Sequence, residues 1–353
     1  MLVESPPEPN SGPPVTPAPS ARAGRHAVRA VGLLVAVGLL VLVCLASIAI
    51  GAKALPLSEV WHGLFHYSGG SGDVLVRDVR VPRTVLGLIV GAALGLAGAV
   101  MQALTRNPLA EPGLLGVNAG AAAAVVSAIT FLGVTSLTGY VWFAFGGAAI
   151  VSVAVYVLGG SRSANPVRLA LAGTAVTAAL FGYVNAVQLL DAAALDRLRF
   201  WTVGSLASAN PETVAKVWPF IALGVLLALL IARPLNALEM GDDTARALGA
   251  HLTRTRVLAM VAVTLLCGAA TAACGPIVFI GLMIPHLVRT ITGPDMRWIL
   301  PYAAVLAPVL LLGADVVGRV VARPSELQVG IVTALLGGPV FIHLVRRKRM
   351  AQL

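Results

Sequence analysis

Charged residues are scarce in this 353-residue chain, where only 11% of the positions are Asp, Glu, Lys or Arg. Soluble domains carry about 25% charged residues, which cover their surface. Hydrophobic residues instead make up 58% of the sequence, and the mean hydropathy is +0.89. The shortage of charge therefore excludes a soluble globular protein and predicts an all-α polytopic membrane protein.

Motifs for catalysis and nucleotide binding are absent. The three lysines, Lys53, Lys216 and Lys348, are followed by Ala, Val and Arg, so the Lys-Ser or Lys-Thr pair of a Walker A motif does not occur. The sequence also lacks the HExxH, GxSxG and dinucleotide-binding patterns. We therefore expect neither enzyme activity nor a cofactor in this chain, and an intramembrane enzyme is disfavoured.

Groups for metal binding and ion coupling are few. Cys44, Cys267 and Cys274 form no CxxC pair, which argues against a zinc site or a disulfide framework. His286 has no second ligand at metal-ligand spacing, so we interpret it as a packing residue. An ion-coupled secondary transporter should carry carboxylates inside its spans, and Asp315 is the one candidate here. We expect it to pair with Arg319 at i,i+4.

Ten apolar segments are candidates for membrane spans, since about 20 apolar residues suffice to cross a bilayer. The run 257–288 is too long for one span and is divided at Cys274-Gly275-Pro276, because Gly and Pro interrupt a helix. The first run is too long for a signal peptide and lacks a small-residue cleavage site. The predicted spans are 31–50, 84–104, 114–134, 138–158, 169–190, 211–232, the two parts of 257–288, 298–317 and 327–345.

The distribution of basic residues predicts the orientation. With ten spans and both termini cytoplasmic, the cytoplasmic segments hold 16 of the 25 Lys and Arg residues, as the positive-inside rule requires. The same rule accounts for the net charge of +10 without a nucleic-acid partner. We predict a disordered, Pro-rich cytoplasmic tail over 1–28 and a transmembrane domain over 29–349 in the cell membrane.

Four motif blocks follow one another along the chain. They begin at Arg80, Asn107, Gly275 and Glu326 and read RVPR, NPLAEPGLLG, GPIVFIGLMIPHLVR and ELQVGIVTALLGGPVF. In this order they resemble the FecCD-type permeases, the membrane subunits of ABC importers for ferric siderophores, haem and cobalamin. One departure is Gln328, where the family commonly has Pro, which would fix φ at the entry to the last helix.

The resemblance implies a permease that forms the pathway for an iron(III)–siderophore complex, with cobalamin or haem as alternative cargo. It implies a second permease, either a copy or a paralogue, and an external substrate-binding protein. Two separate ATPase subunits would bind ATP and Mg²⁺. It also implies that helices 2–5 and 7–10 are inverted repeats.

Polar and glycine positions within the predicted spans carry weaker signals. Gly87, Gly91 and Gly95 are spaced four apart and line one helix face, which favours close helix packing. Asn185 and Gln188 lie on the fifth span, which borders the central pathway in the family that the chain resembles. They are candidate pathway residues, although hydrogen bonding between helices explains them equally well.

The longest polar connection between spans covers residues 233–256. Asp242 and Asp243 suit the first turn of a short helix, where the macrodipole favours negative charge, and Gly249 can end it. The family resemblance identifies this helix as the one that couples to the ATPase. A mere surface connection is the alternative. The candidate coupling residues are Asp242, Asp243, Arg246, Ala247, Leu248 and Gly249.

Four arginines lie at predicted external helix ends, against the positive-inside rule: Arg80, Arg83, Arg319 and Arg323. One interpretation is interfacial anchoring by snorkelling side chains. The family resemblance favours docking of the binding protein through its acidic residues, because guanidinium pairs with carboxylate in a bidentate fork.

Overall fold

The structure is a computed structural model that describes residues 19–134, 136–160 and 166–350. These residues form helices joined by loops, and no strand occurs among them. Seven helical segments are long and apolar enough to cross a membrane, and three shorter apolar helices accompany them. Together they account for the ten predicted spans and confirm the all-α membrane fold.

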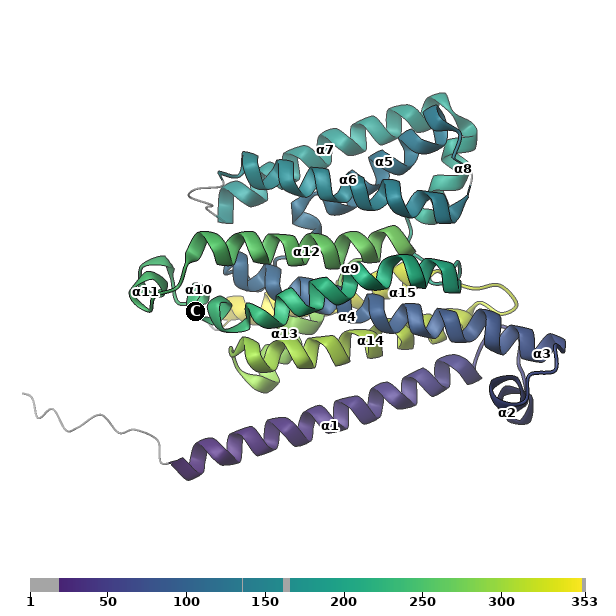
Figure 1. Cartoon of the computed structure of the whole chain (residues 1–353), viewed down its shortest axis with the longest axis horizontal. Helices are drawn as coiled ribbons and strands as arrows, with labels where there is room; N and C mark the ends of the chain where they lie inside the picture. The colour runs from purple at the N-terminus through teal and green to yellow at the C-terminus, as the bar shows by residue number, and fades with distance from the viewer. Residues whose placement is uncertain (1–18, 135, 161–165, 351–353) are drawn as a thin grey trace, which may run out of the picture.

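The ten apolar helices follow the order predicted from the hydropathy pattern (Figure 1). They are α1 (Pro19–Ala49), α4 (Val81–Thr105), α5 (Val117–Leu132), α6 (Leu137–Leu158), α7 (Pro166–Leu190), α9 (Pro211–Leu230), α12 (Leu252–Cys274), α13 (Ile280–Thr292), α14 (Met296–Val321) and α15 (Val329–Met350). The end of α12 at Cys274 confirms the predicted division at Cys274-Gly275-Pro276.

Seven shorter elements connect these helices. They are α2 (Leu57–Phe65), α3 (Ser71–Val74), a π-helical turn at Leu75–Arg80, a 3-10 turn at Pro112–Leu115, α8 (Ala192–Trp201), α10 (Ala232–Glu239) and α11 (Asp242–Ala247). Of these, only α11 was predicted, because the acidic residues of its first turn and the glycine after its end mark its bounds.

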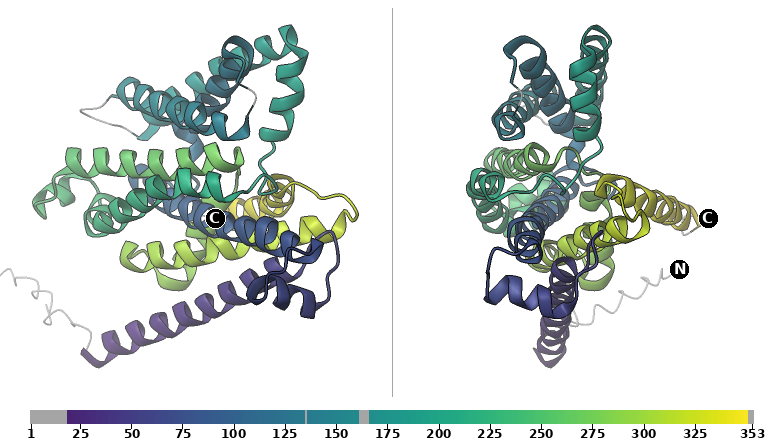
Figure 2. Two further views of the ribbon diagram at one scale, coloured as in Figure 1. Left: turned by 45° about the vertical axis from the view of Figure 1, so that its right-hand side comes forward. Right: turned by 90° about the vertical axis from the view of Figure 1, so that its right-hand side faces the viewer.

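The bundle has two distinct ends (Figure 1). Helices α10 and α11 lie at one end, which we call the α11 end, and α2 and α3 lie at the other, the α2 end. The start of α1 and the end of α15 both lie at the α11 end, as an even number of spans requires. In the side view of Figure 2, α15 projects away from the main bundle.

Helix α4 forms the centre of the bundle and packs most extensively on α14. Its most apolar window is 78% buried, against 11% for the peripheral α1. A Cβ atom at Gly91 would lie 2.6 Å from Cα of Pro308, and one at Gly95 would lie 2.6 Å from the carbonyl oxygen of Ala303. The glycine face therefore serves close helix packing, as its spacing predicts.

Two boundaries differ from the predicted ones. Helix α1 begins at Pro19, so residues 19–28 are helical instead of belonging to the predicted tail, while residues 1–18 lie outside the described residues. Alanines at 21, 23 and 27 favour this extension, since Ala has the highest helix propensity. Helix α12 begins at Leu252, five residues before the predicted span. The charged Arg256 is accommodated there because its guanidinium pairs with Asp242.

Candidate functional site

Three of the four arginines at the α2 end turn inward. The guanidinium of Arg80 donates to the backbone carbonyls of Ile48, Ala49 and Lys53, at 2.9, 2.7 and 2.6 Å. The last carbonyls of a helix have no partner within that helix. Arg80 therefore caps the end of α1 and the turn that follows it.

Arg83 and Arg319 share a buried carboxylate. Arg83 lies 2.8 Å from Asp315 and 2.6 Å from Glu326, and Arg319 lies 3.1 Å from Asp315. The Asp315–Arg319 pair confirms the predicted i,i+4 interaction. Arg319 also donates to the carbonyl of Ser47 at 3.0 Å. The cluster thus joins α1, α4, α14 and the loop before α15.

Burial of this cluster corrects the expected docking surface. The exposed fractions of Arg80, Arg83 and Arg319 are 3, 5 and 2%, and their donors are used inside the protein. Such side chains present almost no surface to a partner. Arg323 differs, because it is exposed while donating one hydrogen bond to the carbonyl of Gly51 at 2.8 Å. Docking through arginine at this end stays a prediction, restricted here to Arg323.

The sequence contained a signal for this inward turn. Asp315 precedes Arg319 by one helical turn, and a carboxylate inside an apolar span needs a cationic partner. That Arg83 is a second partner of Asp315 could not be inferred, since 232 residues separate them.

The predicted short helix at the other end exists as α11, with Asp242 and Asp243 in its first turn. Gly249 has a φ of +76°, so it ends the segment in the left-handed region, as predicted. Asp243 forms an exposed pair with Arg246 at 3.2 Å. The local structure of the candidate coupling segment is therefore confirmed, and its role stays a prediction.

Ion pairs hold the base of α11 against the bundle. Asp242 pairs with Arg256 in α12 at 2.7 Å and with Arg106, which follows α4. Arg106 also donates to the carbonyl of Leu238 at 2.9 Å. Since α4 is the central helix, these contacts link the segment directly to the core.

Helix α10 is fixed in the same way. Glu239 pairs with Arg289 in α13 at 2.7 Å. Asn236 donates to the carboxylate of Asp295 at 2.8 Å and accepts from the amide of Met296 at 2.8 Å. The unit formed by α10 and α11 is therefore anchored to α4, α12, α13 and α14.

Hydrogen bonding controls the ionisation of Asp295, which precedes α14. Burial opposes the charge and alone would raise the pKa of this carboxyl. Hydrogen bonds from Arg297 and Asn236 outweigh burial and lower the pKa from 3.8 to about 2. Asp295 is therefore a carboxylate at neutral pH.

The tip of the segment remains open. Leu248 is 63% exposed and Met240 56%, and Ala247 is exposed beside Leu248. Met240 directly follows α10 and Leu248 directly follows α11, so the anchored unit presents both apolar side chains to its surroundings, and such exposed apolar side chains are candidates for a protein contact. The α10–α11 unit thus has a fixed base and an unoccupied apolar tip.

The candidate pathway residues lie on the outer face of α7. Asn185 is exposed, and Gln188 is partly exposed. Only 17% of the most apolar window of α7 is buried within this chain. The helix can therefore face a pathway or a second subunit, and the role of both residues stays a prediction.

No cluster of three or more His, Cys, Asp or Glu side chains that could hold a metal ion occurs within the described ranges. The three cysteines are free thiols, and Cys267 and Cys274 are buried on α12. The chemistry of the described residues is thus helix packing, internal ion pairing and presentation of exposed faces.

The chain matches known transport proteins over most of its length. The model of the FecCD transport family matches residues 39–347. The ferric enterobactin transport system permease protein FepD of Escherichia coli (strain K12) is 47% identical over 92% of this chain and 96% of its own. The probable siderophore transport system permease protein YfiZ of Bacillus subtilis (strain 168) is 37% identical over 88% of this chain and 93% of its own.

A solved structure shares the arrangement of helices. It is described as an inward-facing conformation of an ABC transporter of the metal-chelate type, and it aligns with a TM-score of 0.79. The two chains are 28% identical, and the alignment covers 89% of this chain and 98% of the other.

Proposed function

The chain belongs to the FecCD transport family, and on this basis we propose that it is the permease subunit of an ABC importer that takes up an iron(III)–siderophore complex. The observation that carries the proposal is the 47% identity to a ferric enterobactin permease over 92% of this chain. The protein crosses the cell membrane several times, in keeping with its ten apolar helices.

The α11 end is cytoplasmic in this proposal and receives the ATPase. The exposed Leu248 and Met240 form the contact, while the pairs Arg106–Asp242 and Arg256–Asp242 transmit movement to α4 and α12. ATP and Mg²⁺ bind to two ATPase subunits, since this sequence has no Walker A motif.

The pathway forms between two permease subunits in this proposal. Helix α7 exposes most of its surface, including Asn185, and α15 exposes Leu335 and Leu336. Pairing these faces with a second subunit would cover them and enclose a route for the chelate. The substrate-binding protein would deliver its cargo at the α2 end.

Uptake into proteoliposomes tests this function. The permease is reconstituted together with its ATPase and substrate-binding protein, and ⁵⁵Fe-labelled ferric enterobactin is supplied outside. Accumulation should require ATP at the ATPase side and should stop with ADP. Accumulation driven by a proton or sodium gradient without ATP would overturn the proposal. Uptake of haem or cobalamin but not of ferric enterobactin would show that the proposed substrate is wrong, while the proposed function as an importer would still hold.

A further inference from the structure

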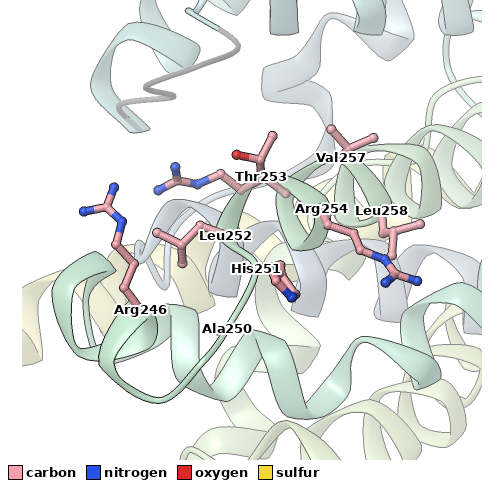
Figure 3. Close-up of a pocket in the computed structure, with 9 residues that line it drawn as sticks. Arg246, Ala250, His251, Leu252, Thr253, Arg254, Val257 and Leu258 are labelled. Atoms are coloured by element: carbon pink, nitrogen blue, oxygen red, sulfur yellow. The ribbon is translucent and has the colours of Figure 1, made fainter.

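A cavity of about 810 Å³ opens where α11 meets the start of α12 (Figure 3). We call it the basic pocket, and its lining residues include Arg246, Arg254 and Arg256, with His251 beside them. Arg246 and Arg254 lie on either side of Leu252 in this view. The pocket also includes Val257, which is 41% exposed.

An apolar groove of about 270 Å³ continues from the basic pocket between α6 and α12. We call it the α6–α12 groove, and it is lined by Phe145, Ser152 and Tyr156 of α6 and by Val257, Val261 and Leu265 of α12, among others. Val257 belongs to both cavities. Arg254, Val257 and Val261 follow one another at helical spacing on one face of α12.

The charge at the mouth of the groove is unbalanced. Arg246, Arg254 and Arg256 line the basic pocket. Asp243 pairs with Arg246, and Asp242 pairs with Arg256 and also with Arg106, so these two carboxylates do not balance the arginines. Arg254 is exposed. The ion pairs of the described residues around it join Arg106, Arg246 and Arg256 to Asp242 and Asp243, and none includes Arg254. Its guanidinium is therefore available to an anion.

The hydroxyl of Ser152 is an unsatisfied polar group inside the apolar groove. Its side chain is 1% exposed, and its hydroxyl has no hydrogen-bond partner among the described residues. A buried hydroxyl without a partner is unfavourable, because it has lost its hydrogen bonds to water. A ligand in the groove with an acceptor oxygen at this depth would satisfy it.

We propose that the basic pocket and the α6–α12 groove together bind one anionic phospholipid. Arg254 contacts the phosphate, an ester oxygen accepts from Ser152, and an acyl chain lies along Val257 and Val261. The depths agree with this assignment. Arg254 is the third residue of a membrane-spanning helix and lies at headgroup level, and Val261 is about 10 Å deeper at 1.5 Å per residue.

The combination of the two cavities distinguishes a lipid from other occupants. A soluble phosphate would use the arginines but would leave the groove and Ser152 unoccupied. A hydrophobic helix of a second subunit would fill the groove but would offer nothing to Arg254. A phospholipid matches both the positive mouth and the apolar groove, and it is present wherever this protein is inserted.

Native mass spectrometry of the full chain in detergent tests the proposal, with titrations of dioleoylphosphatidylglycerol and dioleoylphosphatidylcholine. The parent should bind the anionic lipid more tightly. Arg254→Gln should weaken binding of the anionic lipid about five-fold and remove the preference. Val261→Trp should fill the groove and weaken binding of both lipids. The matched control Arg233→Gln removes an exposed arginine of α10 outside both cavities and should bind as the parent does.

Three results would overturn the proposal. The first is equal binding of the two lipids by the parent, and the second is unchanged binding of the anionic lipid in both Arg254→Gln and Val261→Trp. The third is displacement of the lipid by millimolar glycerol phosphate, which would indicate a site for a soluble anion. Thermal unfolding of each variant verifies folding, and if Arg254→Gln is unfolded, Val261→Trp and the competition experiment still decide.

Discussion

The guanidinium Nη2 of Arg83 in α4 lies 2.8 Å from Oδ1 of Asp315 in α14, although 232 residues separate them in the chain. Neither residue is more than 5% exposed. Arg319 approaches the same carboxylate from its own helix, and its other donors reach the last turn of α1. One carboxylate thus pairs with two arginines and, through them, joins three spans at the α2 end.

Removing that charge should destabilise the protein strongly. We expect Asp315→Asn to reduce the free energy of unfolding by about 3–5 kcal/mol, because two buried guanidinium groups lose their shared counter-ion. Thermal unfolding in detergent measures the change. The control is Asp196→Asn, which removes an exposed pair with Arg199 and should cost no more than about 1 kcal/mol. Similar midpoints for the two variants would show that the buried cluster contributes little.

The contact of α4 with α13 at Gly98 should not accommodate an added methyl group. A Cβ atom at Gly98 of α4 would overlap the backbone of Gly281 in α13, and backbone on both sides cannot move aside. We expect Gly98→Ala to cost about 1–3 kcal/mol or more through overpacking. Gly313→Ala on α14 is the matched control, since nothing lies within 4 Å of its Cβ position. The recovery of monodisperse protein by size-exclusion chromatography compares the two, and equal recovery would contradict the packing described for α4.

The stability contribution of Asp295 should depend on pH. Its pKa is about 2 in the folded protein instead of 3.8, so the folded state favours the carboxylate. Because the folded state binds the proton of Asp295 less tightly than the unfolded state, the contribution of this carboxylate to folding stability is fully present above pH 3.8 and is lost as the pH falls through about 2. Asp295→Asn removes the charge and retains an N-cap side chain. We expect its unfolding midpoint to lie below that of the parent at pH 7 and the difference to shrink between pH 4 and pH 2. A constant difference across this range would mean that the charge is not the cause.

The exposed tip of the α10–α11 unit should be needed for coupling and not for folding. We expect Ala247→Asp combined with Leu248→Asp to abolish transport and the stimulation of the ATPase, because charge replaces the apolar contact. Membrane insertion and the unfolding midpoint should match the parent, since both side chains are exposed. Proteoliposome uptake and ATPase assays measure the effect.

Leu195→Asp, which changes an exposed leucine of α8 at the α2 end, serves as the control. Normal transport by the double variant would exclude this tip as the coupling contact.

Arg323 should contribute to docking at the α2 end. We expect Arg323→Glu to weaken association with the binding protein about ten-fold at low salt, since a rim charge acts mainly on the encounter rate. The difference should diminish at high salt, and basal ATPase activity should be retained. Surface plasmon resonance with the reconstituted permease measures both conditions. The conservative variant Arg323→Lys, which keeps the charge, should bind nearly as the parent does. Equal affinity of the Glu variant and the parent at low salt would leave Arg323 as an anchor of the loop before α15.

The number and order of the spans follow from local sequence. A run of about 20 apolar residues has no favourable state in water and must form a helix in the bilayer, where each amide needs a partner within its own segment. Breaks such as Gly275-Pro276 and starts such as Asp242-Asp243 act within one or two turns, so their effect is visible without knowledge of the fold. The spacing of Gly91 and Gly95 likewise predicts a packing face, because only helical periodicity is needed to align them.

Only the tertiary structure decided where the charges point. Arg80, Arg83, Arg319 and Arg323 have the same side chain and similar flanking sequence, yet three are buried and one is exposed. Their direction depends on where Asp315 and the end of α1 lie after the helices have packed, which is a non-local property. The same holds for Asp242, whose partners Arg106 and Arg256 come from two helices, and for the α6–α12 groove, whose walls are about 100 residues apart. Apolar periodicity determines a helix one turn at a time, whereas a buried ion pair exists only when both of its partners have been placed.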